Sequence, residues 1–275
     1  MNAKLLILFS LSIAFNCFGQ VSPAEKKALI KLYHATKGNQ WLTTWDLKTP
    51  VKTWYGVKVE NDHVVELNLQ GNNLKGSLPE AMGDLVYLQK LNLSFNTLTG
   101  IIPSTIGSLQ DLKSLELFLN KFEGEIPQAL GNLRNLEVLS LYSNMFVGEI
   151  PVELTTLVNL KELALGSNFL TGRIPVSINK LINLKKLSLI DNQLEGEIPV
   201  ELCELSNLEE LILSSNRLTG MLPFDIYKLK KLNLLMVSDN YLNKEYVTVS
   251  GKKPPGIMVI PEENENALAT DFDED

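Results

Sequence analysis

Along most of the chain, two leucines flank one variable residue, and this short apolar–variable–apolar pattern recurs at a fixed interval. In the last copy, valine replaces the second leucine. An apolar residue at every second position predicts a short strand with leucines on one face and variable residues on the other. The pairs are Leu67/Leu69, Leu91/Leu93, Leu115/Leu117, Leu139/Leu141, Leu163/Leu165, Leu187/Leu189, Leu211/Leu213 and Leu235/Val237. A fixed interval of this length predicts a solenoid, in which each strand pairs in parallel with its equivalent one repeat away.

An asparagine follows each leucine pair and recurs at an unbroken spacing of 24 residues. The eight are Asn72, Asn96, Asn120, Asn144, Asn168, Asn192, Asn216 and Asn240. The amide side chain carries both donors and an acceptor, so it can satisfy the backbone groups that a turn leaves unpaired. We therefore expect a ladder of structural asparagines that links each repeat to the next, and we assign these residues no ligand.

A second fixed phrase follows each asparagine. Seven repeats place a glycine four residues after it, where the backbone needs unusual angles or a close approach, and a proline three residues later. Leucines such as Leu109 and Leu112 then recur at helical or 3-10 spacing. These positions predict short helical segments on the outer side of the solenoid.

The repeated phrase Leu-x-x-Leu-x-Leu-x-x-Asn-x-Leu-x-Gly-x-Ile-Pro resembles the plant-specific, 24-residue class of leucine-rich repeat. Eight copies occupy residues 64–243. The resemblance implies an α/β solenoid: a right-handed superhelix with a parallel β-sheet on its concave face and short 3-10 or helical segments on its convex side. It also implies a role in binding proteins or peptides. It does not identify the partner, because a fold alone does not set a function.

The first 19 residues have the features of a signal peptide. Lys4 supplies the positive start, residues 5–15 are apolar or small, and Cys17-Phe18-Gly19 places small residues before a cleavage point at Gln20. A lipid anchor on Cys17 is the alternative, although the residues before that cysteine match such a site poorly. No later segment has the length and apolarity of a transmembrane helix. We expect an exported protein, secreted or at the cell surface.

Residues 20–63 are predicted to form an N-terminal cap, because the first repeat of a solenoid must be covered. Ser22-Pro23 begins a capped helix that runs to Ala35, and residues 57–65 have the pattern of a hairpin. Three tryptophans, Trp41, Trp45 and Trp54, are expected in the core of the cap. The segment resembles the cap of plant leucine-rich-repeat proteins but lacks their paired cysteines, which indicates a bacterial exported relative.

Residues 244–275 are predicted to complete the C-terminal end. Residues 244–260 have the pattern of a short strand or hairpin, whereas residues 262–275 contain seven acidic residues and no Lys or Arg. We expect this tail to be disordered and solvated, with weak calcium binding as the alternative. The charge of the tail, −7, equals the net charge of the whole chain, and no basic stripe exists to bind nucleic acid.

Catalytic chemistry has little support in the sequence. After removal of the signal peptide, Cys203 is the one remaining cysteine, and we expect it to be buried. The two histidines, His34 and His63, both fall in the predicted cap without a neighbouring nucleophile or a metal-ligand spacing. We predict a non-enzymatic protein with no catalytic residue, cofactor or metal.

The variable positions of the strands and turns are the predicted binding surface, since the leucines are already buried. Exposed aromatic side chains on adjacent repeats form hot spots for a protein partner or a stacking platform for a sugar. The predicted partner-binding residues are Phe95, Glu116, Phe118, Leu119, Tyr142 and Ile190. In an alternative, Phe95 and Leu119 tuck into the turn, and only Phe118 and Tyr142 are exposed.

The sequence therefore favours an exported scaffold that recognises a protein or peptide on its concave face, including inhibition of a secreted enzyme. Adhesion to polysaccharide or to a cell surface is the alternative. Ice binding occurs in some leucine-rich solenoids and requires a flat, regular array of Thr or similar residues. The outward positions here are irregular, which disfavours that function.

Overall fold

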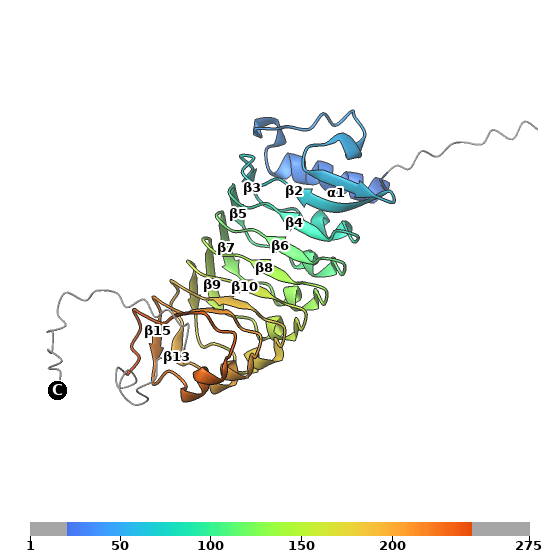
Figure 1. Cartoon of the computed structure of the whole chain (residues 1–275). Coiled ribbons are helices and arrows are strands. Elements are labelled where there is room, and N and C mark those ends of the chain that lie inside the picture. The colour runs from blue at the N-terminus through green and yellow to red at the C-terminus, as the bar shows by residue number, and fades with distance from the viewer. Residues whose placement is uncertain (1–20, 244–275) are drawn as a thin grey trace, which may run out of the picture.

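The computed structural model describes residues 21–243, which form one curved stack of repeats behind an N-terminal cap (Figure 1). Within this range, no helix has the length and apolar character that a bilayer crossing requires. The predicted signal peptide, the alternative lipid anchor at Cys17, the strand or hairpin at residues 244–260 and the acidic tail lie outside the described residues.

The leucine pairs form the predicted sheet along one face of the stack. It contains nine strands, of which β1 is antiparallel to β2 and the others are parallel. They are β1 (Val57–Glu60), β2 (His63–Asn68), β4 (Lys90–Asn92), β6 (Ser114–Glu116), β8 (Val138–Ser140), β10 (Glu162–Ala164), β12 (Lys186–Ser188), β14 (Glu210–Ile212) and β16 (Leu234–Met236). Leucine pairs with leucine from strand to strand, as Leu91 does with Leu115, so equivalent residues of all repeats lie in straight rows.

A second set of strands follows the asparagines. These strands were not predicted from the sequence. β3 (Lys75–Gly76), β5 (Thr97–Gly100), β7 (Lys121–Glu125), β9 (Met145–Glu149) and β11 (Phe169–Thr171) form one parallel sheet. β13 (Glu195–Glu197) pairs with β15 (Arg217–Thr219). The two strand sets run side by side along the stack (Figure 1). Seven of the eight repeats therefore contribute one strand to each of two faces, with the asparagine turn between them.

Short 3-10 helices complete each repeat after its proline, as predicted. They span Glu80–Asp84, Ser104–Ser108, Gln128–Asn132, Val152–Thr156, Val176–Lys180, Val200–Glu204 and Phe224–Lys228. Proline precedes each helix in an extended conformation, and the following leucine ends it, as Pro103 and Leu109 do. Leu109 and Leu112 are fully buried, so the helices close the outer side of the core.

The asparagine ladder has the predicted arrangement and is directional. In the central repeats the side chain donates to a carbonyl of the preceding repeat and to two carbonyls of its own turn. Asn168 Nδ2 lies 3.1 Å from Leu141 O, 3.0 Å from Leu165 O and 3.1 Å from Gly166 O. Its Oδ1 accepts from the N–H of Phe146, again in the preceding repeat. The ladder therefore satisfies buried backbone groups that no strand would pair.

The N-terminal cap agrees with the predicted helix, tryptophan core and hairpin. α1 (Pro23–Ala35) begins at Ser22, whose hydroxyl accepts from the Glu25 N–H, and Trp41, Trp45 and Trp54 are buried beside it. Two further 3-10 turns, Gly38–Gln40 and Val51–Thr53, lie between the helix and β1. Asn72 joins the cap to the stack, because its side chain both donates to and accepts from the backbone of Thr43.

Candidate partner-binding surface

Three aromatic side chains from consecutive repeats form one cluster on the concave face. The rings of Phe118 and Tyr142 are stacked, with centroids 4.5 Å apart and planes 13° apart. Phe95 meets Phe118 edge-on at 5.3 Å. Such pairs stabilise one another beyond their buried area, so the rings hold a defined position before any partner arrives. We call Phe95, Phe118 and Tyr142 the aromatic cluster.

The two bulky residues of the turn point outward. Phe95 is 50% exposed and Leu119 is 37% exposed. The alternative in which both tuck into the turn is therefore wrong. Leu119 lies one repeat beyond Phe95 in the same row, since Asn96 N donates to Leu119 O across the repeats.

Phe95 and Leu119 also have left-handed backbone angles, with φ of 55° and 53°. Glycine, serine or aspartate occupies this turn position in the other repeats, and those residues tolerate the conformation better than a bulky apolar one. They are Gly71, Ser143, Ser167, Asp191, Ser215 and Asp239. All eight turns share the left-handed angle, so what distinguishes these two repeats is a large apolar side chain in a conformation that bulky residues rarely adopt. Strain of this kind concentrates at binding sites.

Glu116 lies on the same strand face as Phe118, two residues away, and is held by neighbouring polar side chains. Ser114 Oγ donates to Glu116 Oε1 at 2.8 Å, and Asn92 Nδ2 donates to Glu116 Oε2 at 3.2 Å. Asn92 is itself fixed, because its Oδ1 accepts from both the N–H and the hydroxyl of Ser94. The structure therefore places a positioned carboxylate beside the aromatic cluster.

Ile190 is separated from the cluster. It lies two repeats beyond Tyr142 and leans over Gly166, where its Cγ2 would be 2.6 Å from any added Cβ. The absence of a side chain at residue 166 leaves the space that Ile190 covers. Ile190 thus belongs to the same outward row, although it is not part of the ring stack.

Tyr142 keeps its proton at neutral pH. Burial of the hydroxyl raises its pKa above the usual range, Lys186 opposes this shift, and Glu162 and Glu116 add to it. A neutral phenol can both donate and accept a hydrogen bond. The cluster therefore presents two apolar rings and one polar tip.

A hollow of about 320 Å³, which was not predicted from the sequence, lies at the N-terminal end of the concave face. Its lining includes the exposed ring of Tyr55 and the side chains of Asn68 and Gln70. Asn68 and Gln70 occupy the same outward rows as Glu116 and Phe118, two repeats earlier. The two amide residues at outward positions were the sequence signal for this hollow. Their proximity to Tyr55 could not be predicted, because it depends on how the cap folds.

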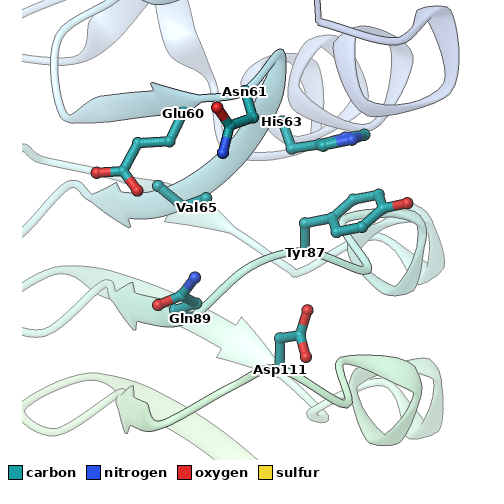
Figure 2. Close-up of a pocket in the computed structure, with 7 residues that line it drawn as sticks. All are labelled: Glu60, Asn61, His63, Val65, Tyr87, Gln89 and Asp111. Atoms are coloured by element: carbon teal, nitrogen blue, oxygen red, sulfur yellow. The ribbon is translucent and has the colours of Figure 1, made fainter.

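A second hollow of about 140 Å³ lies where the cap meets the first repeats, and it too was not predicted (Figure 2). Val65, Gln89 and Asp111 line it on the repeat side. His63 stacks on Tyr87 with ring centroids 3.6 Å apart. Its Nδ1 also lies 3.4 Å from the buried carboxylate of Glu25. His63 thus fastens the cap to the first repeats.

Metal-ligating side chains are not gathered in the part of the chain that the structure describes. No three His, Cys, Asp or Glu side chains between residues 21 and 243 are arranged to hold a metal ion. Cys203 is buried, as predicted, and burial raises the pKa of its thiol to about 11. A thiol that keeps its proton at neutral pH is a poor nucleophile.

The family follows from the repeats themselves. Models of the leucine-rich repeat match residues 63–85, 87–146 and 158–218. A plant ice-binding protein of known structure is 31% identical, and the alignment covers 88% of this chain and 79% of that one, with a TM-score of 0.76. The chain belongs to the leucine-rich-repeat family. Its parallel sheet and short 3-10 helices are the arrangement expected of a leucine-rich-repeat solenoid.

Other leucine-rich-repeat structures are similar over part of their length. The plant peptide hormone receptor RGFR1, solved in complex with RGF2, is 35% identical over 63% of this chain and 28% of that chain, with a TM-score of 0.62. A leucine-rich-repeat protein of Leptospira interrogans is 33% identical over 70% of this chain and 53% of that one, with a TM-score of 0.57. The chain spans only 28% to 32% of the first receptor chains that it matches.

Proposed function

We propose that this leucine-rich-repeat protein is a binding scaffold that recognises a protein or peptide on its concave face. The aromatic cluster carries the proposal: Phe118 and Tyr142 are stacked, and Phe95 is exposed beside them in a strained conformation. Aromatic side chains with restricted motion dominate the energy of protein interfaces. Leu119, Glu116 and Ile190 complete the proposed surface.

Similar proteins support this class of partner. The receptor RGFR1, whose ectodomain shares this solenoid, is a peptide hormone receptor. Peptide binding by this chain remains our proposal, because the chain spans a small part of that receptor. A carboxylate fixed beside the rings adds specificity, since Glu116 would pair with a donor or a positive charge on the ligand.

A capture experiment tests the site. The protein on beads is exposed to an extracellular extract, beside the variant with Phe118→Asp and Tyr142→Asp. The matched control carries Phe224→Asp and Tyr227→Asp, because these two exposed rings on the outer side also contact each other, at 5.1 Å. We expect a partner that the protein and the control retain at similar levels, and that the cluster variant loses at least tenfold.

The result separates the proposed functions. The melting temperature of the cluster variant should stay close to that of the protein, because the replaced rings are only half-buried and do not belong to the hydrophobic core. Unfolding of this variant would show that the rings are structural and would contradict the site. Competition by soluble glycans, with glycans among the captured molecules, would favour adhesion to polysaccharide instead.

Ice binding deserves a direct control because a similar plant protein is described as ice-binding. The outward rows here carry Phe, Tyr, Glu and Lys among smaller residues, so they lack the flat, regular array that ice requires. We expect no inhibition of ice recrystallisation. Inhibition that survives in the cluster variant would favour ice as the ligand.

We also propose that residues 1–19 are removed during export by a bacterial cell. The apolar run after Lys4 and the small residues before Gln20 support this proposal. The intact mass of the protein recovered from the medium tests it. A chain that begins at Gln20 supports cleavage by signal peptidase, whereas a lipid attached to Cys17 supports the alternative anchor.

A further inference from the structure

A second exposed surface lies on the other sheet, and the proposed function does not use it. Three large apolar side chains are exposed on β9 and β11: Met145 is 45%, Val147 43% and Phe169 48% exposed. Phe169 lies opposite Val147 in the strand register, and Met145 lies on the same face of β9 as Val147. They form a continuous apolar group on a sheet, which we call the side patch.

Glutamates surround the side patch. Glu123 lies opposite Met145, and Glu125 lies opposite Val147 on the neighbouring strand β7. Glu149 follows on β9, and its Cγ is 2.8 Å from where a Cβ of residue 172 would stand, so its stem lies flat along the sheet. Each apolar side chain of the patch thus has a carboxylate nearby.

Within residues 21–243, the carboxylates around the patch have no ion pair, whereas some other glutamates of the repeats do. Glu137 pairs with Lys161 at 2.7 Å, and Glu209 pairs with Lys185 at 3.2 Å, each across one repeat. Among residues 21–243, no Lys, Arg or His nitrogen lies within 4.0 Å of the carboxylates of Glu123, Glu125 or Glu149. The patch therefore combines exposed apolar area with carboxylates that make no direct ion pair within the described chain, although Lys121 lies two residues from Glu123 on the same face of β7.

The side patch and the aromatic cluster occupy different faces. Tyr142 precedes the buried Asn144 in the chain, whereas Met145 follows it on the second sheet. The ladder therefore separates the two surfaces, and a partner can occupy one without displacing a ligand from the other.

We propose that the side patch binds a segment of another protein that presents an apolar side chain between Lys or Arg residues. The apolar side chain would cover Val147 and Phe169, and the basic residues would pair with Glu125 and Glu149. Opposite charges at the edge of an apolar contact favour both encounter and register. The acidic residues 262–275 of this chain have the same charge as the patch, so they are not the ligand.

Selection from a library of random twelve-residue peptides displayed on phage tests this proposal. The bait is the full protein, and selected peptides are then measured by fluorescence polarisation. We expect sequences in which Lys or Arg flanks an aromatic or aliphatic residue. Their affinity should fall at least tenfold for the variant with Glu125→Lys and Glu149→Lys.

A matched variant separates the patch from the general charge of the protein. Glu80→Lys with Asp84→Lys makes the same change of charge at two exposed positions of the outer 3-10 helix Glu80–Asp84, which is not part of the second sheet. This control and the Phe118→Asp/Tyr142→Asp variant should both bind the peptides as the wild type does. Circular dichroism and thermal melting establish that each variant is folded.

Three results would overturn the proposal. Peptides without basic residues, or no selected peptides, would show that charge does not define the ligand. Equal affinity for the patch variant and the Glu80→Lys/Asp84→Lys control would place binding elsewhere. A dimer in light scattering that becomes a monomer in the patch variant would show that this face binds a second copy of the chain.

Discussion

Each ladder asparagine is adjacent in the chain to the turn residue that precedes it. The two positions are nevertheless under different structural constraints. Every repeat has asparagine at the ladder position, whereas the preceding position holds glycine, serine, aspartate, phenylalanine or leucine. The ladder side chains are mostly buried, and they hydrogen-bond to backbone groups of two repeats. The preceding side chain is free to point outward. The same turn therefore holds one residue that stabilises the stack and one residue that is available to a partner.

The largest expected effect comes from breaking the ladder. Asn168→Ala removes three hydrogen bonds to carbonyls and leaves the buried N–H of Phe146 without its acceptor. An unsatisfied buried group costs roughly 1–3 kcal/mol, so we expect a loss of about 3 kcal/mol in the free energy of unfolding. Urea denaturation monitored by circular dichroism measures this loss.

Asn240→Ala is the matched control at the other end of the ladder. Asn240 makes equivalent hydrogen bonds but is only partly buried, so water can replace its amide. We expect a smaller loss of about 1 kcal/mol. Equal losses at the two positions would show that burial does not determine the strength of the ladder.

The comparison is sharpened by making the turns of repeats two and three resemble the others. Phe95→Ser with Leu119→Ser places at both turns the residue that three other repeats hold at the same left-handed angle. The cost of that angle, roughly 1–2 kcal/mol, comes from the Cβ atom that serine also carries, so it changes little. The lost buried area is small, because both side chains are exposed. We expect the free energy of unfolding to change by less than about 1 kcal/mol, while binding of the partner falls at least tenfold.

The reverse substitution tests whether the turn tolerates a bulky residue. Ser143→Phe places a large ring at φ of 55° in the next repeat, and we expect a loss of less than about 1 kcal/mol, because serine already carries the Cβ atom that makes this angle unfavourable. A loss above about 3 kcal/mol in the double serine variant would show that Phe95 and Leu119 belong to the core. Binding unchanged by that variant would remove both residues from the proposed surface.

Most of the fold could be predicted from the sequence. The strongest sequence signals come from buried residues that have the same packing role in every repeat. The leucine pairs, the asparagine spacing and the prolines correctly predicted the first sheet, the ladder and the 3-10 helices. The second sheet was missed. Its strands are only two to five residues long, and Phe169 pairs with Val147, 22 residues earlier, instead of at the 24-residue period.

The features of the surface could be predicted less completely from the sequence. The stacking of Phe118 on Tyr142 agrees with their shared row, since strict register brings equivalent residues of adjacent repeats together. The hollow beside Tyr55 depends on how the cap folds against the first strand, which no periodic pattern encodes. The side patch was missed with its sheet, although the unbroken apolar run of Met145, Phe146 and Val147 was a signal.

The direction of the asparagine ladder has a consequence for how the protein is assembled in time. Asn72 reaches back to the cap, and Asn168 reaches back to Leu141 and Phe146, so each amide completes the segment made before it. A chain grows from its N-terminus during synthesis, and folding of a repeat array can spread from a neighbour that is already formed. Each emerging repeat therefore carries the group that closes its predecessor, and a chain halted midway leaves only its newest repeat incomplete.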